Sequence, residues 1–144
     1  MIRSSFALTS GPAAPRAASQ AEYRPGVCNI GPAEIAKRRL AGHIGLVATV
    51  LVLAALLAVG VPSIFRIVLV LPAAAAASGY LQAWLKFCAG FGSLGLFNFD
   101  AVGGTQPVVD AEARRRDRRR ANQIGLASVL VGVAVALAAF LLPL

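Results

Sequence analysis

The sequence predicts an all-α membrane protein with three transmembrane helices. Three apolar stretches carry this prediction, and each is close to the roughly 20 residues that cross the hydrocarbon core of a bilayer as a helix. They cover residues 40–60, 65–85 and 124–142. Hydrophobic residues make up 58% of the chain and charged residues 14%, which is too little charge to cover the water-facing surface of a soluble domain. The bilayer is therefore expected to be the main solvent.

The basic residues predict the orientation of these spans. Of the 14 Lys and Arg residues, all except Arg66 lie on one side of the three stretches. By the positive-inside rule, the N-terminus and the loop 86–123 are cytoplasmic and the C-terminus is outside. We expect an integral protein of a bacterial plasma (inner) membrane.

The sequence predicts a disordered N-terminal tail at residues 1–22, followed by one membrane domain at 23–144. The tail has no acidic residue before Glu22 and is rich in Ala, Ser and Pro, a composition typical of disorder. The same composition resembles an organellar presequence, although Pro12 and Pro15 interrupt a long amphipathic helix. An organellar membrane is therefore the alternative location.

A helix is predicted to begin near Pro32 and to run without a break into the first span. Proline suits the first helical position, where its missing N–H would have no partner, and Gly31 or Asn29 can act as the cap. Pro62 ends this span, and the short turn that follows returns the chain as a helical hairpin.

Pro72 removes one backbone hydrogen bond from the second span, so we expect an irregularity near residues 67–71. Ala74, Ser78 and Gln82 follow at a spacing of four and form one face with little bulk. Small residues allow a neighbouring helix to approach closely in lipid, so this face should be buried against protein. Arg66 is expected to extend to the membrane surface.

The segment 87–99 is rich in phenylalanine and glycine and too short to span the bilayer. It predicts a cytoplasmic interfacial segment between helices two and three, with phenylalanines at the acyl boundary. From Asp110 a charged helix should run into the third span. That span carries a second small-residue face, formed by Ser128, Gly132 and Ala136.

A polybasic stretch precedes the third span, at the place where orientation signals occur. Such a stretch also attracts anionic lipid headgroups, so membrane lipids are expected partners. Nucleic acid is not expected, because no aromatic residues alternate with the arginines. The stretch consists of Arg114, Arg115, Arg116, Arg118, Arg119 and Arg120.

Cys28 and Cys88 are the two cysteines, and both are expected on the cytoplasmic side, where thiols stay reduced. They could bind a soft metal or exchange electrons, and the predicted helix N-terminus near Cys28 would lower its thiol pKa. A structural zinc site uses four ligands, whereas one chain offers two thiols and His43. A homodimer could bring four thiols together. Packing of small cysteines is the favoured interpretation, and no cofactor is identified.

The spans contain no Asp or Glu, and the chain has no recognisable catalytic set. We therefore expect a protein that is not an enzyme. The leading hypothesis is an accessory, assembly or structural subunit of a larger membrane complex, with other membrane subunits or a second copy as partners. The alternative is a thiol-dependent metal or redox protein that uses Cys28 and Cys88.

Two short segments suggest a relationship. The letters CNIGPAEI at residues 28–35, with FCAGFG at 87–92 and NF at 98–99, resemble a family of small, uncharacterised prokaryotic membrane proteins. The resemblance covers about residues 23–125. It implies a prokaryotic origin and no particular activity.

Overall fold

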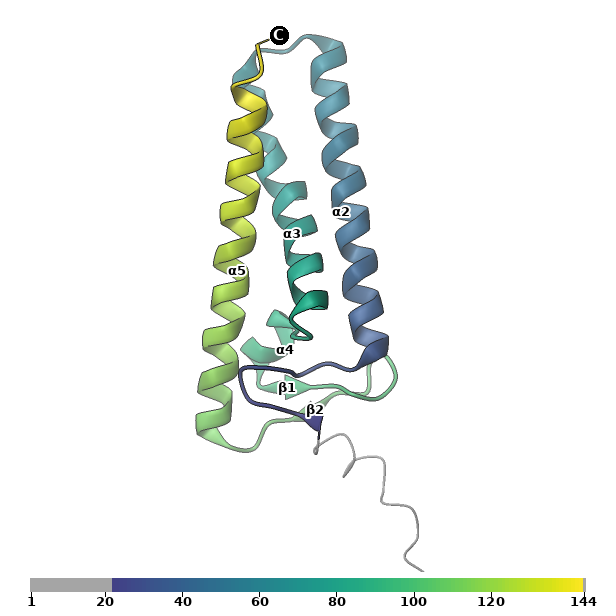
Figure 1. Ribbon diagram of the computed structural model, residues 1–144, viewed down its shortest axis with the longest axis vertical. Helices are drawn as coiled ribbons and strands as arrows, with labels where there is room; N and C mark the ends of the chain where they lie inside the picture. The colour runs from purple at the N-terminus through teal and green to yellow at the C-terminus, as the bar shows by residue number, and fades with distance from the viewer. Residues whose placement is uncertain (1–21, 144) are drawn as a thin grey trace, which may run out of the picture.

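The computed structural model describes residues 22–143, so the tail expected at 1–22 lies outside the described residues except for Glu22. The described part is 71% helical. Figure 1 shows the long helices running side by side. In chain order the helical elements are α2 (Pro32–Val59), the 3-10 helix η1 (Ser63–Leu69), α3 (Val70–Trp84), α4 (Ala89–Leu94) and α5 (Ala111–Phe140).

Within residues 22–143, three helical segments are long and apolar enough to cross a membrane. They are α2, the continuous segment Ser63–Trp84 formed by η1 and α3, and α5. The prediction of three membrane-spanning helices is therefore confirmed at the level of helix length and composition. The chain is an integral membrane protein by this criterion.

The ends of α2 follow local sequence signals. The helix begins at Pro32 after the cap residue Gly31, as expected. It continues without a break to Val59, where Gly60 adopts a left-handed conformation with φ of 71°. The N–H of Gly60 then donates to the carbonyl of Leu57 at 3.2 Å. Glycine ends the helix here because it adopts this φ without a steric penalty.

Pro72 explains the change of helix type in the second span. Ser63–Leu69 is a 3-10 helix, and regular α-helix starts at Val70. Pro72 is thus the third residue of α3, where the proline nitrogen has no intrahelical acceptor to lose. The junction between the two helix types lies within the stretch 67–71 in which we expected an irregularity, and the 3-10 helix itself begins earlier, at Ser63.

α3 packs against both α2 and α5. On the α2 side, a Cβ atom placed on Gly79 would overlap the main chain of Gly42, and one on Gly45 would lie 2.6 Å from the nitrogen of Ala76. On the α5 side, a Cβ atom on Gly132 would lie 2.6 Å from the carbonyl oxygen of Val70. Glycine is required at these contacts because the backbones touch, which is the packing that lipid-embedded helices favour.

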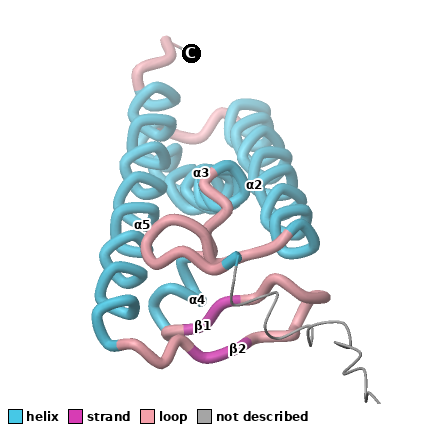
Figure 2. Tube along the Cα trace, turned by 60° about the horizontal axis from the view of Figure 1, so that its bottom comes forward, coloured by secondary structure: helices cyan, strands magenta, loops and turns pink. Residues whose placement is uncertain are grey.

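The end of the bundle where α2 and α5 begin is closed by a structure that we call the polar cap, formed by residues 22–31 and 85–110. Figure 2 shows it from below, with α4 and two short strands beneath the long helices. β1 (Leu96–Phe97) pairs antiparallel with β2 (Gln106–Pro107). The prediction of an all-α fold therefore needs one correction, because this strand pairing lies inside the loop 86–123.

The phenylalanines of the polar cap face protein. Phe87 is completely buried against Ala121 and Ile124 of α5, and Phe97 is 3% exposed. The ring of Phe97 stacks on Tyr23 with 4.7 Å between centroids. The expectation that these side chains enter the acyl boundary is wrong for Phe87 and Phe97. Burial under α5 removes them from lipid and gives the cap an apolar core of its own.

Candidate functional site

The polar cap and the first turns of α2 and α5 contain the most deeply buried polar side chains in the described part of the chain. Asn29, Asn98 and Asp117 are completely buried, and Glu34 is 1% exposed. Burial of such groups is costly unless hydrogen bonds replace those made with water. The hydrogen-bond partners of these side chains therefore show which segments are joined at this end of the molecule.

Asn29 joins the N-terminal turn to the start of α4. Its Nδ2 donates to the carbonyl oxygen of Cys88 at 3.1 Å, and its Oδ1 accepts from the amide of Cys88 at 2.6 Å. The amide of Asn29 also donates to the carbonyl oxygen of Lys86 at 3.2 Å. One side chain thus satisfies both main-chain groups of a residue 59 positions away.

Asn98 connects the same turn to the beginning of α2. The amide of Asn98 donates to the Asn29 carbonyl at 2.9 Å, and the amide of Gly31 donates to the Asn98 carbonyl at 2.8 Å. The Asn98 side chain donates to the carbonyl of Ala101 at 3.0 Å and to Glu34 Oε1 at 3.4 Å. Glu34 in turn pairs with Arg38 at 3.5 Å, one helical turn further along α2.

Asp117 attaches the turn at residues 22–31 to α5. Its carboxylate accepts from the Tyr23 hydroxyl at 2.7 Å and from the amide of Gly26 at 2.6 Å. Gly26 has a φ of 71°, a conformation that glycine adopts freely and that lets the turn lie against α5. Burial and the hydrogen bond to Asp117 raise the pKa of Tyr23 well above its usual range.

The two cysteines share the polar cap but have different surroundings. Cys88 is buried and caps α4, with its sulfur accepting from the amide of Phe91 at 3.5 Å. Cys28 is half-buried, with its sulfur 3.8 Å from the carbonyl oxygen of Ile30. Both thiols are free. Residues 22–143 contain no cluster of three or more His, Cys, Asp or Glu side chains that could hold a metal ion.

The expected lowering of the Cys28 pKa is wrong. Burial raises the pKa of the Cys28 thiol, and this effect exceeds the opposing effects of the hydrogen bond to Ile30 and of the charges on Lys86 and Arg24. A raised pKa leaves less thiolate at neutral pH, whereas reactive and metal-binding cysteines are usually stabilised as thiolates.

The small residues predicted on the second span lie on the α5 side of α3 and near its end. A Cβ atom on Gly132 would be 2.9 Å from the Cβ atom of Ala74, so these two helices meet there. Ser78 Oγ accepts from Gln82 Nε2 at 2.8 Å. Gln82 Oε1 accepts from the amide of Ala89 at 2.9 Å, which links α3 to α4.

Ala74 and Ser78 are half-buried, whereas the small residues predicted on the third span are buried within the bundle. Ser128 is 4% exposed, and its hydroxyl donates to the carbonyl of Ile124 in its own helix at 2.7 Å. Ala136 is 5% exposed and packs with Leu69 and Ala139.

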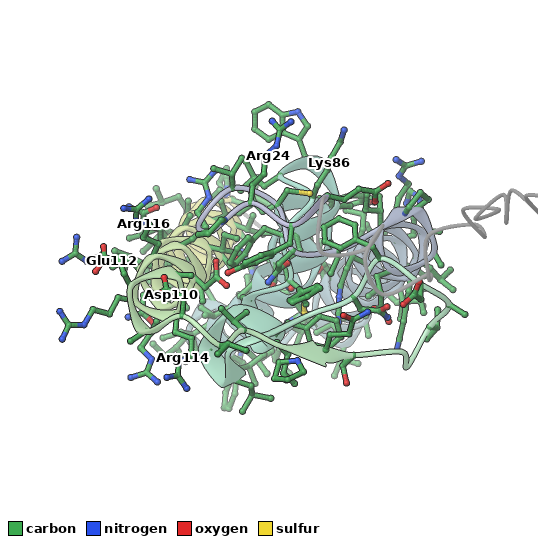
Figure 3. All side chains as sticks on the ribbon, turned by 90° about the horizontal axis from the view of Figure 1, so that it is seen from below. Arg24, Lys86, Asp110, Glu112, Arg114 and Arg116 are labelled. Atoms are coloured by element: carbon green, nitrogen blue, oxygen red, sulfur yellow. The ribbon has the colours of Figure 1, made fainter. Side chains whose placement is uncertain are left out.

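The polybasic stretch surrounds the first turns of α5. Five of its arginines are exposed and Arg120 is half-buried. Arg116 Nε lies 3.3 Å from Glu112 Oε1, an exposed pair one turn apart. Figure 3 shows Arg114 and Arg116 extending outward from α5. The exposed arginines are Arg114, Arg115, Arg116, Arg118 and Arg119.

Arg66 does not extend to the membrane surface as expected. It is 4% exposed, and its Nη1 donates to the carbonyl of Ala139 at 2.8 Å and to that of Leu142 at 3.1 Å. Ala139 lies in the last turn of α5 and Leu142 lies just past its end, where the helix dipole favours a positive charge. Arg66 therefore caps α5 from η1, at the end opposite the polar cap.

Two sets of residues were missed from the sequence. The Gly42 and Gly45 pair, three residues apart, could have been read as a close-packing face on α2. The roles of Asn98 and Asp117 had no local signal, because each depends on segments far apart in the chain. The resemblance to the small prokaryotic membrane family stays a prediction. The chain matches no protein-family model, and no curated protein and no solved structure shows a significant similarity to it.

Proposed function

We propose that this chain is a non-catalytic integral membrane protein that serves as an accessory or assembly subunit of a larger membrane complex. The observation that best supports this proposal is the use of the buried polar side chains. Asn29 joins two segments of the polar cap, and Asn98 and Asp117 join the cap to α2 and α5. Groups held in this way stabilise a rigid surface and are poorly placed to act on a substrate.

In this proposal the polar cap is cytoplasmic, with the N-terminus inside and the C-terminus outside, in the plasma membrane of a bacterium. The support is the charge distribution, since Arg66 alone among the Lys and Arg residues lies at the other end of the spans. The exposed arginines of α5 would then contact anionic headgroups, at about 1 kcal/mol for each basic residue near the surface.

A partner helix is proposed to pack on the outer face of α5. Gly125 is exposed, and a Cβ atom placed there would meet nothing within 4 Å. The small residue leaves a shallow site on an apolar helix, where another membrane helix could approach closely. Either a different subunit or a second copy of the chain could supply that helix.

The test is purification of the tagged chain from its own cells in a mild detergent. A species larger than the monomer is expected, and Gly125→Leu should reduce its yield because a leucine blocks the approach. Val131→Leu, also exposed on α5, is the matched control and should leave the yield unchanged. A lone monomer for the unmodified chain would contradict the proposal. A copurifying metal that is lost without Cys28 and Cys88 would favour the thiol hypothesis instead.

A further inference from the structure

A cavity of about 560 Å³ opens between the turn at residues 22–31, the start of α2 and the end of α3. Residues from all three segments line it, among them Arg24, Cys28, Ile35, Trp84 and Lys86. The second apolar span ends at residue 85, so the cavity lies at the depth where lipid headgroups meet the acyl chains.

The polar side of the cavity has an excess of positive charge. Arg24 and Lys86 line it together with Glu22, and neither basic side chain forms an ion pair with a residue in the described range 22–143. Figure 3 shows Arg24 and Lys86 at the same edge of the molecule, away from the arginines of α5. The cap residue of α2, Gly31, also lines the cavity and forms no side-chain capping bond. The positive end of the α2 dipole therefore adds to the two cations.

The other side of the cavity is apolar. Trp84 is 79% exposed, and Ile35 and Leu85 are half-buried beside it. Tryptophan is enriched where a membrane meets water, because its ring is apolar and its N–H is polar. The cavity thus offers cations for a headgroup and apolar side chains for the part of an amphiphile next to that headgroup.

The backbone of Lys86 gives a second indication. Its φ is +52°, a left-handed conformation that is strained for lysine and natural for glycine or asparagine. The position is the first after the cap residue of α3, and its carbonyl accepts the amide of Asn29 at 3.2 Å. The turn would form more easily with glycine, so the presence of lysine points to a role for its side chain.

We propose that this cavity binds one anionic phospholipid, with its phosphate between Arg24 and Lys86 and the start of an acyl chain against Trp84 and Ile35. The site is separate from the polybasic stretch of α5, whose arginines line two smaller pockets of about 270 Å³ each. It also needs no protein partner. The test of this lipid site therefore does not depend on whether the chain is an accessory subunit.

Trp84 provides the assay, because it is the one tryptophan in the sequence. The purified full-length chain in a zwitterionic detergent is titrated with brominated phosphatidylglycerol or brominated phosphatidylcholine, and quenching of Trp84 fluorescence is measured. Saturable quenching with at least a tenfold preference for the anionic lipid is expected. Equal quenching by the two lipids would overturn the proposal.

The double variant Arg24→Gln and Lys86→Asn should lose most of this preference. Asparagine tolerates the left-handed conformation, so the turn is expected to survive, and circular dichroism checks the fold. The matched control, Arg115→Gln with Arg118→Gln, removes the same charge from α5 and should change the affinity less than twofold. An equal loss in the control would show diffuse attraction and contradict a defined site. Complete displacement of the lipid by millimolar inorganic phosphate would also overturn it, in favour of a free-phosphate site.

Cys28 gives an independent measurement in a Cys88→Ser background, where serine can still cap α4. Bound phosphatidylglycerol should slow maleimide labelling of Cys28 several-fold, because the thiol lines the same cavity. Lys86→Asn should reduce this protection, because Arg24 alone then holds the phosphate. Labelling that is unaffected by the anionic lipid would contradict occupation of the cavity.

Discussion

The side chain of Asn29 forms two hydrogen bonds with the main chain of Cys88, at 3.1 Å and 2.6 Å, although the residues are 59 positions apart. Both residues are buried, at 0% and 2% exposure. The amide group of the Asn29 side chain thus pairs with the N–H and the carbonyl of Cys88, as the main chain of a neighbouring β-strand would. This contact decides where α4 begins relative to the turn that precedes α2.

Asn29→Ala should therefore destabilise the polar cap. The change leaves the buried N–H of Cys88 without a partner, which costs about 1–3 kcal/mol, whereas the Cys88 carbonyl still accepts the amide of Gly92 at 2.9 Å. We expect a loss of about 1–3 kcal/mol in the free energy of unfolding, measured in mixed detergent micelles with increasing denaturing detergent. Asn122→Ala, at an exposed position of α5, is the control and should have little effect. Equal stability of the two variants would show that Asn29 does not hold the cap.

The contact between α2 and α3 gives a second prediction. Gly79→Ala places a Cβ atom into the main chain of Gly42, so the helices must separate. Overpacking of this kind costs about 1–3 kcal/mol. Gly125→Ala is the matched change in open space, where alanine should stabilise the helix by up to about 1 kcal/mol. Thermal unfolding in detergent should therefore move in opposite directions for the two variants.

The long helices could be predicted from the sequence because their signals are local. A run of apolar residues, Pro32 at a helix start and Asp110 as the cap of α5 each act within a few positions. The polar cap had no such signal. The pairing of Gly26 with Asp117 spans 91 residues, and that of Asn98 with Glu34 spans 64. Their partners become known once the helices are placed side by side.

The same difference explains the errors about Phe87 and Arg66. An aromatic segment beside a membrane is typical of interfacial insertion, and an arginine near a helix end typically extends to the headgroups. Phe87 instead fills a space under α5, and Arg66 binds the last carbonyls of α5. In both cases the side chain contacts a part of α5 that is distant in sequence, and these contacts replace contacts with the membrane.

Arg66→Met should loosen the C-terminal end of α5. The change removes two hydrogen bonds from a charged donor, each worth about 1.5–3 kcal/mol in typical cases, although methionine also avoids the cost of burying a charge. These two effects oppose each other in the global free energy of unfolding, so the test measures the local opening of the C-terminal end of α5. Hydrogen exchange at residues 139–142 should become at least several-fold faster, whereas Arg66→Lys, which keeps the charge, should have a smaller effect. Unchanged exchange in Arg66→Met would contradict a capping role.

The raised pKa of Cys28 predicts how its reactivity depends on pH. Thiol alkylation proceeds through the thiolate, whose fraction at pH 7 falls as the pKa rises above its usual value of about 8.5. In a Cys88→Ser background, Cys28 should react more slowly at pH 7 than an unperturbed cysteine, with a rate that increases about tenfold per pH unit beyond pH 8. Because the Lys86 charge lowers this pKa, Lys86→Asn should slow the reaction further. A rate that levels off below pH 8 would instead indicate a stabilised thiolate and revive the metal or redox hypothesis.

The orientation of the chain can be tested at its C-terminus. An odd number of spans places the two ends on opposite sides of the membrane, and the arginines that precede the third span should keep the polar cap in the cytoplasm. A reporter that is active only outside the cytoplasm, fused after Leu144, should therefore be active. Replacing all six arginines of the polybasic stretch with glutamine should weaken this orientation and produce a mixed population. Removal of Arg66 should not, because this residue lies at the opposite end and is held by α5. Activity of a cytoplasmic reporter at Leu144 in the unmodified chain would rule out the proposed orientation.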